Sequence, residues 1–389
     1  MTPSPSNITG RRYPSSETLM AEAMAAANLS DFGHGDFRHG LDVLLASLER
    51  DADFDLSADA RLIRVLRRRL INRLEVEQWY REHPELENLS VRGPVDIVGF
   101  PRTGTTALAN MMSLDSQFRC LRGWEQARPC PPPILGQEAQ DPRRLGAARH
   151  YDQRDPEAMA LHLYELDATT EDTELLGMAC RDPGYTWPVY GYHAWWRDAD
   201  FTVAYHYHRR VVKLLQSRRP PALWLFKAPH RIFNLEAIVE AYPDVRFIMT
   251  HRDPGKVVPS YASLVSTIFP APGGERDMRR LGREVCEHLL DGMRAAIGAR
   301  ERLGEDRFLD VHHHELVRDP LETVRRVYDF VGVPWRDDVQ RSVLVWQERN
   351  KPGAYGQHRY SAEQFGLSAA RIRSDYDFYI ERFDVKLES

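Results

Sequence analysis

The feature that most constrains this chain is a strand-like segment that runs through a glycine-containing loop into an amphipathic helix. It extends from Val95 to Leu108 and reads VDIVGFPRTGTTAL. Gly99 and Gly104 stand five positions apart, as in loops whose backbone N–H groups hold a phosphate at a helix N-terminus. The segment therefore predicts an α/β fold with an anion site where this loop meets its helix.

Position 105 limits the chemistry of that site, because Thr105 stands where nucleotide triphosphatases carry the lysine of their phosphate loop. Those enzymes need the lysine on the β- and γ-phosphates, so its loss argues against cleavage of ATP or GTP. Arg102, inside the loop, supplies positive charge from a different direction.

Beyond the loop, short apolar runs alternate with helical stretches, which is typical of a parallel sheet covered by helices. The clearest helix is Leu321 to Val331, where Asp319 caps the start and Gly332 follows the end. We expect a P-loop-NTPase-like three-layer α/β fold with a central parallel sheet. The predicted strands are Val95 to Phe100, Ala222 to Phe226, Val245 to Thr250 and Arg307 to Val311.

Two regions are predicted to be additions to this α/β unit, which we place at residues 93–389. Residues 1–92 form a helical N-terminal extension packed on the core, because apolar residues recur there at helical spacing. Residues 125–221 form a long, mainly helical insertion rich in aromatic residues. These side chains either wall an acceptor pocket or lid, or simply fill a core.

A second motif lies at the end of the third predicted strand. His251, Arg252 and Asp253 follow this strand, and Ser260 comes eight positions after Arg252 on the next predicted helix. Arginine offers a charged fork to a phosphate, and a serine hydroxyl adds another donor. Two anion sites on one sheet predict a ligand with phosphates at both ends of a nucleoside.

Composition excludes several other classes of protein. Of 389 residues, 52 are Lys or Arg and 57 are Asp or Glu, and the net charge of −5 argues against a nucleic-acid-binding surface. No apolar run approaches the ~20 residues of a membrane span, and the first ten residues lack the apolar core of a signal peptide. We therefore expect a cytoplasmic protein. Its four cysteines, without a C-x-x-C pair, are expected to be reduced thiols.

Together these motifs resemble those of the PAPS-dependent sulfotransferases, in particular a bacterial branch with a helical N-terminus. Residues Pro101 to Thr106 are similar to the family's P-[KR]-[ST]-G-T-T loop, and the spacing of Arg252 and Ser260 is similar to its second phosphate element. His314 to Pro320, followed by Phe330 to Gly332, is similar to a further hallmark of this fold. The resemblance covers about Val95 to Gly332.

The resemblance implies transfer of the sulfuryl group of PAPS to a hydroxyl of a small-molecule, sugar or lipid acceptor, with release of PAP and no metal requirement. It also implies which residues bind the donor. The 5′-phosphosulfate falls to the loop and the 3′-phosphate to Arg252 and Ser260. A further family loop that covers the 3′-phosphate is matched loosely, by Lys351 or Arg359. The loop residues are Pro101, Arg102, Thr103, Gly104, Thr105 and Thr106.

For catalysis we expect His230 to be the base that takes the proton of the acceptor hydroxyl. A base works best with a pKa near neutrality, and His230 follows a predicted strand, where open α/β sheets place their chemistry. Lys227 and Arg102 would stabilise the leaving phosphate or orient the sulfonate. Glu171 or Asp172 is the alternative base, in the acidic run of the insertion.

Two other functions remain open from the sequence. A small-molecule kinase would need magnesium and an acidic residue, for which Asp310 or Asp253 are candidates. A non-catalytic PAP- or nucleotide-binding protein would keep the phosphate sites without turnover. A metal site at His312 to His314 is disfavoured, because only two of three consecutive strand residues share a face. The acceptor and the oligomeric state are not predicted.

Overall fold

A five-stranded, wholly parallel sheet organises the fold of the computed structural model, which describes residues 12–51, 54–151, 166–181, 189–220, 222–268, 276–351 and 361–388. The strand order across the sheet is β2-β3-β1-β4-β5. The four predicted strands are confirmed, with ends shifted by up to three residues. The strands are β1 (Arg92–Gly99), β2 (Phe118–Cys120), β3 (Leu223–Lys227), β4 (Arg246–His251) and β5 (Phe308–His312).

The sheet lies between two helical layers, because successive residues of each strand point to opposite faces. On β1, Ile97 points into one apolar cluster and Val98 into the other. The layer beside Ile97 contains α4 (Thr105–Met112), α14 (His313–Arg318), α15 (Pro320–Val331) and α16 (Asp337–Arg349). The layer beside Val98 contains α10 (Thr202–Gln216), α11 (Leu235–Ala241), α12 (Pro254–Ile268) and α13 (Met278–Leu303).

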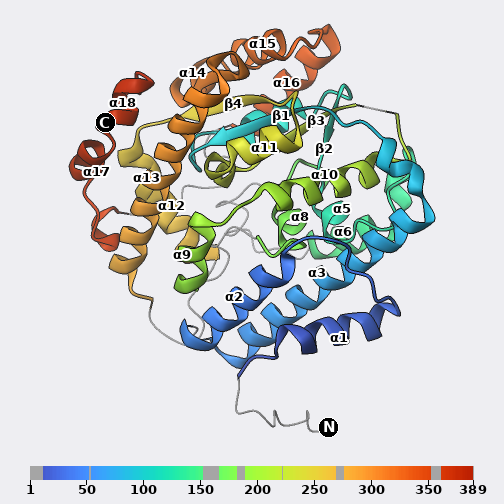
Figure 1. The fold of residues 1–389 in the computed structure, drawn as a ribbon. Helices are drawn as coiled ribbons and strands as arrows, with labels where there is room; N and C mark the ends of the chain where they lie inside the picture. The colour runs from blue at the N-terminus through green and yellow to red at the C-terminus, as the bar shows by residue number, and fades with distance from the viewer. Residues whose placement is uncertain are drawn as a thin grey trace.

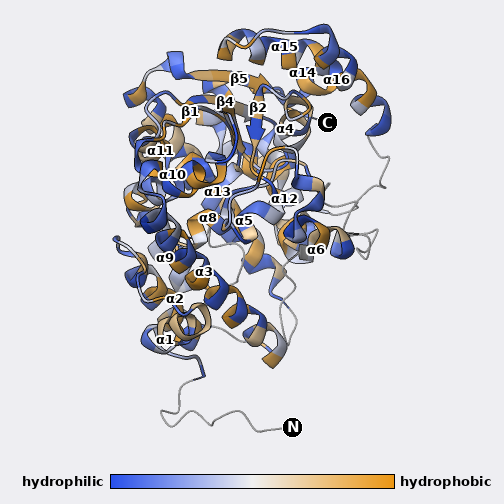
Figure 2. Cartoon of the chain, turned by 90° about the vertical axis from the view of Figure 1, so that its right-hand side faces the viewer, coloured by the Kyte–Doolittle hydropathy of each residue, from blue (hydrophilic) through white to orange (hydrophobic). Residues whose placement is uncertain are grey.

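Figure 1 shows these layers, with α14, α15 and α16 on one side of the strands and α10 and α11 on the other. In Figure 2 the apolar colour gathers in the layer of strands. The three-layer α/β fold predicted from the sequence is thereby confirmed. Two helices near the end of the described chain, α17 (Ala369–Asp375) and α18 (Asp377–Arg382), add to the cluster beside Val98.

The helices before β1 are joined to this cluster as well. Leu66, Leu70 and Leu74 of α3 are buried in it, as their spacing on one helix face predicts. Arg73 is also buried, and donates hydrogen bonds to three backbone carbonyl groups of other segments. The elements are α1 (Ser16–Ala27), α2 (Phe37–Asp51), α3 (Leu56–Glu82) and the 3₁₀ turn η1 (Pro84–Asn88).

The region between β2 and β3 is helical in its described parts. The aromatic side chains of α9 and α10 are mostly buried in the core, although Tyr190 and Trp195 are only partly buried, and Tyr185 and Trp187 lie outside the described residues. That this region walls an acceptor pocket stays a prediction. The buried aromatic residues are Tyr192, Trp196, Phe201, Tyr205 and Tyr207. The elements are α5 (Gly123–Ala127), η2 (Glu138–Gln140), α6 (Pro142–Tyr151), α8 (Thr173–Gly177), α9 (Tyr190–Asp198) and α10.

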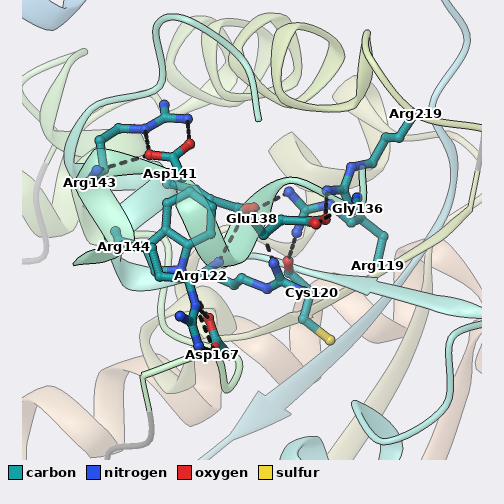
Figure 3. A network of polar contacts seen from close by, with 12 residues as sticks. Arg119, Cys120, Arg122, Gly136, Glu138, Asp141, Arg143, Arg144, Asp167 and Arg219 are labelled. Carbon is teal, nitrogen blue, oxygen red and sulfur yellow. Dashed lines mark hydrogen bonds and ion pairs between the residues drawn. The ribbon is translucent and has the colours of Figure 1, made fainter. Parts of the chain in front are cut away.

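A network of arginines and carboxylates fastens this region to the edge strand β2 (Figure 3). Backbone contacts continue from it, because Thr170 N–H donates to the carbonyl oxygen of Leu121 at 3.0 Å. The acidic run after Thr170 is thereby held beside the end of β2. The ion pairs join Arg119 to Glu125, Arg143 to Asp141, Arg144 to Asp167 and Arg219 to Glu138.

Candidate active site

The strands end at a common edge of the sheet, and most of the predicted site residues lie there. Ile97 of β1 stands beside Lys227 of β3, and Gly99 stands beside Thr250 of β4. Open α/β sheets bind their ligands at this carboxyl edge. This parallel register explains why motifs that are separate in the sequence lie close together in the structure.

The glycines of the loop are needed because the backbone passes very close to its neighbours. Gly99 has a φ of 125°, and a Cβ there would lie 2.5 Å from the carbonyl oxygen of Thr250. Gly104 has a φ of 95° and precedes α4 directly. A Cβ at Gly104 would lie 2.7 Å from a methyl carbon of Leu316. The loop therefore turns tightly into a helix N-terminus, the geometry of a phosphate cradle.

The side chains of the loop divide between two roles. The Thr103 hydroxyl is buried and donates to the carbonyl oxygen of Phe100 at 2.6 Å, so it stabilises the turn. Thr105 is buried at the start of α4. Arg102 adopts a left-handed conformation with a φ of 67° and stays partly exposed. Donor contacts by Pro101 and Thr106 remain predictions.

Arg102 comes together in space with Arg252 and Ser260, although it lies 150 and 158 positions before them in the chain. Arg102 Nε donates to Ser260 Oγ at 3.2 Å, and Arg252 Nη1 donates to the carbonyl oxygen of Arg102 at 3.0 Å. Ser260 lies on α12, as expected. Two guanidinium groups and a hydroxyl thus meet at Arg102 in the loop, three residues before α4 begins.

A carboxylate that the sequence did not point to lies on Arg252. Glu388 accepts from Arg252 Nε at 2.7 Å and from Nη2 at 2.9 Å. The backbone N–H of Glu388 donates to Asp253 Oδ2 at 2.9 Å, and Arg373 donates to its carbonyl oxygen at 2.6 Å. Burial would raise the pKa of Glu388, but the hydrogen bond and charge of Arg252 outweigh it and lower the pKa.

Lys227, at the end of β3, is buried and its Nζ donates to Glu171 Oε1 at 3.0 Å. Glu171 comes from the insertion, and its carbonyl oxygen accepts from the Gln126 side chain at 2.8 Å. The predicted catalytic lysine and one of the two alternative bases are therefore direct partners. Their contact places the acidic run at the same edge as the loop.

His230 lies three residues beyond Lys227, in the 3₁₀ turn η4 (Pro229–Phe233). Its side chain is 8% exposed, and Asp172 Oδ1 lies 3.8 Å from its Nε2. Burial lowers the pKa of His230, and the nearby charges of Asp172 and Glu171 oppose that shift. The imidazole is therefore neutral near pH 7, as a proton acceptor must be.

Two predicted donor contacts near the end of the chain find no support. Lys351 pairs with Glu348 at 2.8 Å, and both side chains are strongly exposed. Arg359 lies outside the described residues. Their roles remain predictions.

The carboxylates proposed for a kinase are already neutralised by other groups. Asp310 accepts from Arg300 at 2.7 and 2.8 Å and contacts His251 Nε2 at 2.8 Å, and Asp253 accepts from Arg373 at 2.6 Å. Neither is poised to bind magnesium in this arrangement. Across the described ranges, no group of three histidine, cysteine or acidic side chains is placed to hold a metal ion.

Comparisons with known proteins agree with the family resemblance of the sequence motifs. A model of the sulfotransferase family matches residues 94–337, more than half of the chain. The omega-hydroxy-beta-dihydromenaquinone-9 sulfotransferase Stf3 of Mycobacterium bovis is 27% identical over 125 residues, 32% of this chain and 32% of that protein. The protein-tyrosine sulfotransferase of Drosophila melanogaster is 28% identical over 102 residues, 26% of this chain and 19% of that protein. The chain thus spans at most about a third of the length of these curated relatives.

Solved structures match over nearly the whole chain. Sulfotransferase STF9 from Mycobacterium avium superposes with a TM-score of 0.88 at 25% identity, covering 97% of this chain and 99% of that one. Sulfotransferase STF1 from Mycobacterium tuberculosis gives a TM-score of 0.83 at 24% identity, covering 93% and 98%, which shows a shared fold. Within the described residues, no helix is long and apolar enough to cross a membrane. The family match, together with the loop and its converging arginines, shows that this chain belongs to the sulfotransferase family.

Proposed function

We propose that this protein transfers the sulfuryl group of PAPS to a hydroxyl group of a small-molecule, sugar or lipid acceptor and releases PAP. The observation that carries the proposal is the convergence of Arg102, Arg252 and Ser260 on the helix N-terminus after the loop. It provides two neighbouring sets of anion donors, and a nucleoside with phosphates at both ends needs two. The names of the two curated relatives, a hydroxy-menaquinone and a tyrosine sulfotransferase, are both consistent with a hydroxyl acceptor.

The residues have separate tasks in this proposal. The loop amides and Arg102 hold the 5′-phosphosulfate, while Arg252 and Ser260 hold the 3′-phosphate. The bond from sulfur to the 5′-phosphate oxygen breaks, a bond from sulfur to the acceptor oxygen forms, and His230 takes the hydroxyl proton. Lys227 compensates the charge that gathers on the leaving phosphate oxygen, where fixed positive groups lower the barrier most. The proposal includes no metal ion.

Lys227 also has to change partner during this reaction. In the structure its ammonium group is paired with Glu171 at 3.0 Å. Glu171 is partly exposed and can turn towards solvent, whereas Lys227 is buried and needs a new anionic partner, which the leaving phosphate oxygen provides. Glu171 then lies beside the acceptor and is available to orient it.

Transfer of labelled sulfate from PAPS to a panel of hydroxyl compounds tests the activity directly. Phenols, sugars and lipid head groups should be screened together with the wild-type chain and the variant His230→Ala. We expect a labelled product with the wild type and loss of at least ~100-fold in rate with the variant. PAP binding without any transfer would instead favour the non-catalytic binding protein.

Arg252→Ala tests the site of the 3′-phosphate. Loss of a charged fork should weaken binding of PAP about 10- to 100-fold, while adenosine 5′-phosphosulfate, which lacks that phosphate, should lose much less. Isothermal titration with both nucleotides measures the difference. Arg318→Ala, an exposed arginine on α14, is the matched control. Equal weakening of both nucleotides would reject the assignment of Arg252.

A further inference from the structure

Two buried polar atoms face each other behind the candidate base without a hydrogen bond. His230 Nε2 and Asp172 Oδ1 lie 3.8 Å apart, both are shielded from solvent, and neither has a hydrogen-bond partner among the described residues. A buried polar atom left unpaired costs about 1 to 3 kcal/mol, so such atoms usually pair with something. One is a potential N–H donor and the other an acceptor, and a small ring movement brings them into contact.

The carboxylate of Asp172 is held firmly in this position. Its second oxygen, Oδ2, accepts from Arg231 Nη2 and lies 3.2 Å from His208 Nε2. Its backbone carbonyl oxygen accepts the N–H of Leu175 at 3.0 Å at the start of α8. Three elements, α8, η4 and α10, thus meet at one buried group. Asp172 moves little, and an adjustment between Asp172 and His230 falls to the imidazole.

Asp172 is also ionised. Burial by itself would raise its pKa, but the charge of Arg231 and the contact with His208 outweigh burial and hold the pKa of this carboxyl well below its usual range. Arg231 makes a second buried ion pair with Asp96 of β1. Because Asp172 is already committed to Arg231, it is poorly suited to take a proton from an acceptor. The sequence-based alternative of Asp172 as the base is therefore disfavoured, and a supporting role fits its contacts.

The charges around His230 set which of its nitrogens carries the proton. Lys227 and Arg231 are the nearby cations, Glu171 and Asp172 are the nearby anions, and His288 of α13 is a further titratable neighbour. In a neutral imidazole one nitrogen is a donor and the other an acceptor. A carboxylate facing Nε2 favours the proton on Nε2, which leaves the lone pair on Nδ1.

We propose that Asp172 is a positioning residue that holds His230 in the tautomer protonated on Nε2, so that Nδ1 accepts the proton of the acceptor hydroxyl. The acceptor O–H bond breaks, an N–H bond forms at Nδ1, and Asp172 stays ionised and stabilises the imidazolium. A buried carboxylate does the same for the histidine of serine proteases. The role of Nδ1 rests on the proposed sulfuryl transfer, whereas the tautomer is a property of the protein alone.

Nitrogen-15 NMR of the full chain labelled at histidine reads the tautomer directly, because protonated and unprotonated ring nitrogens have well-separated shifts. The His230→Gln variant identifies the signals of His230 by their loss. In the wild type, with and without PAP, we expect a protonated Nε2 and an unprotonated Nδ1. A wild type with the proton on Nδ1 overturns the proposal, and this reading needs no mutation of Asp172.

Asp172→Asn and Asp96→Asn form a matched pair, since each removes one of the two carboxylates that contact Arg231, and only Asp172 faces His230. We expect Asp172→Asn to abolish the tautomer preference and to lower the pKa of His230 in an NMR pH titration, while Asp96→Asn preserves both. Transfer should then fall at least ~10-fold more in Asp172→Asn than in Asp96→Asn. Equal effects of the two variants on tautomer, pKa and rate would show a purely structural role and reject the inference.

The two proposals fail in distinguishable ways. Should PAP not bind and no sulfate be transferred, the proposed function fails while the NMR reading of His230 still stands. Should transfer proceed with His230 protonated on Nδ1, the function stands and the assignment of Asp172 fails.

Discussion

The guanidinium of Arg252 is hydrogen-bonded to Glu388, which competes with a phosphate for the same donors. A phosphate that binds Arg252 must displace a carboxylate held by two charge-assisted hydrogen bonds. Glu388 also brings a negative charge close to the incoming phosphate. If Arg252 holds the 3′-phosphate as proposed, we expect the affinity for a doubly phosphorylated nucleotide to be reduced by the cost of moving Glu388.

Glu388→Gln should tighten PAP binding about 3- to 10-fold, because the amide competes less well for Arg252 and no longer repels the phosphate. Isothermal titration at constant ionic strength measures the change. Glu381→Gln, on an exposed position of α18, serves as the control and should leave the affinity unaltered. Unchanged or weaker binding by Glu388→Gln would show that Glu388 helps to hold the nucleotide.

His230 predicts the pH dependence of transfer. A base must be unprotonated, and burial lowers the pKa of His230 below its ordinary value of about 6.5. The facing groups Asp172 and Glu171 oppose this shift, while Lys227, Arg231 and His288 do not. The rate constant should therefore be level at pH 8 and fall in an acid limb centred below pH 6.5. An acid limb centred above pH 7 in the labelled-PAPS assay would point to a different base.

The sequence predicted some of the contacts at the candidate site and missed others. That Arg102, Arg252 and Ser260 lie close together was predictable, because each stands at a fixed spacing from a strand end and the parallel register brings strand ends together. Their binding of the donor stays a prediction. Glu388 and Arg231 carried no such signal. Their roles depend on contacts between segments that are distant in the sequence, such as Arg231 with Asp96, 135 positions apart.

Among the strands, too, some can be predicted from their own residues, whereas another depends on a partner that is distant in the sequence. Four were predicted from apolar runs of about five residues, whereas β2 is only three residues long and, among the described strands, pairs with β3 alone. Such a short edge strand exists because its neighbour supplies the hydrogen bonds, which the local sequence does not reveal. The region between β2 and β3 was predicted to be an addition that walls a pocket or fills a core, and most of the described aromatic side chains of α9 and α10 are buried in the core.

The carboxylate of Asp310 on β5 joins three elements, because it contacts His251 of β4 and accepts hydrogen bonds from Arg300 of α13. Asp310→Asn should lower the free energy of unfolding by on the order of 1 to 3 kcal/mol, a range that allows for its partial exposure. PAP affinity should not change. Urea unfolding and isothermal titration measure both, and Asp306→Asn, an exposed neighbour, is the control.

The free energy of unfolding that Asp310 contributes is expected to decrease in acid. Burial would raise the pKa of Asp310, but the hydrogen bonds from His251 and Arg300 outweigh burial and depress it. The stabilisation is therefore fully present above the unfolded pKa of about 4 and is lost as the pH falls below it. The difference between wild type and Asp310→Asn should shrink in that range. A stable Asp310→Asn that binds PAP but loses all sulfuryl transfer would show that Asp310 acts in the reaction rather than in the fold.

Residues from α1 to the segment after α18 contribute to one apolar cluster, so the N-terminal extension and the α/β unit share a core. Arg73 of α3 is a buried charged residue at that junction, and its guanidinium needs several acceptors. It donates to the carbonyl oxygens of Phe32 at 2.7 Å, His34 at 2.6 Å and Met178 at 3.1 Å. Its guanidinium also lies 3.8 Å from the centre of the Tyr207 ring.

Arg73→Met should cost about 3 to 5 kcal/mol, because methionine fills part of the volume but leaves three carbonyl groups, two of them in buried contacts, without their donor. With a shared core, the loss should lower the melting temperature of the whole chain in a single transition, and PAP binding should disappear at the temperature where helicity is lost. Circular dichroism at 222 nm and PAP titration at several temperatures test this. Arg64→Met, an exposed arginine on the same helix, should melt like the wild type. Two separate transitions, with PAP still bound after the first, would show instead that the extension folds independently of the donor site.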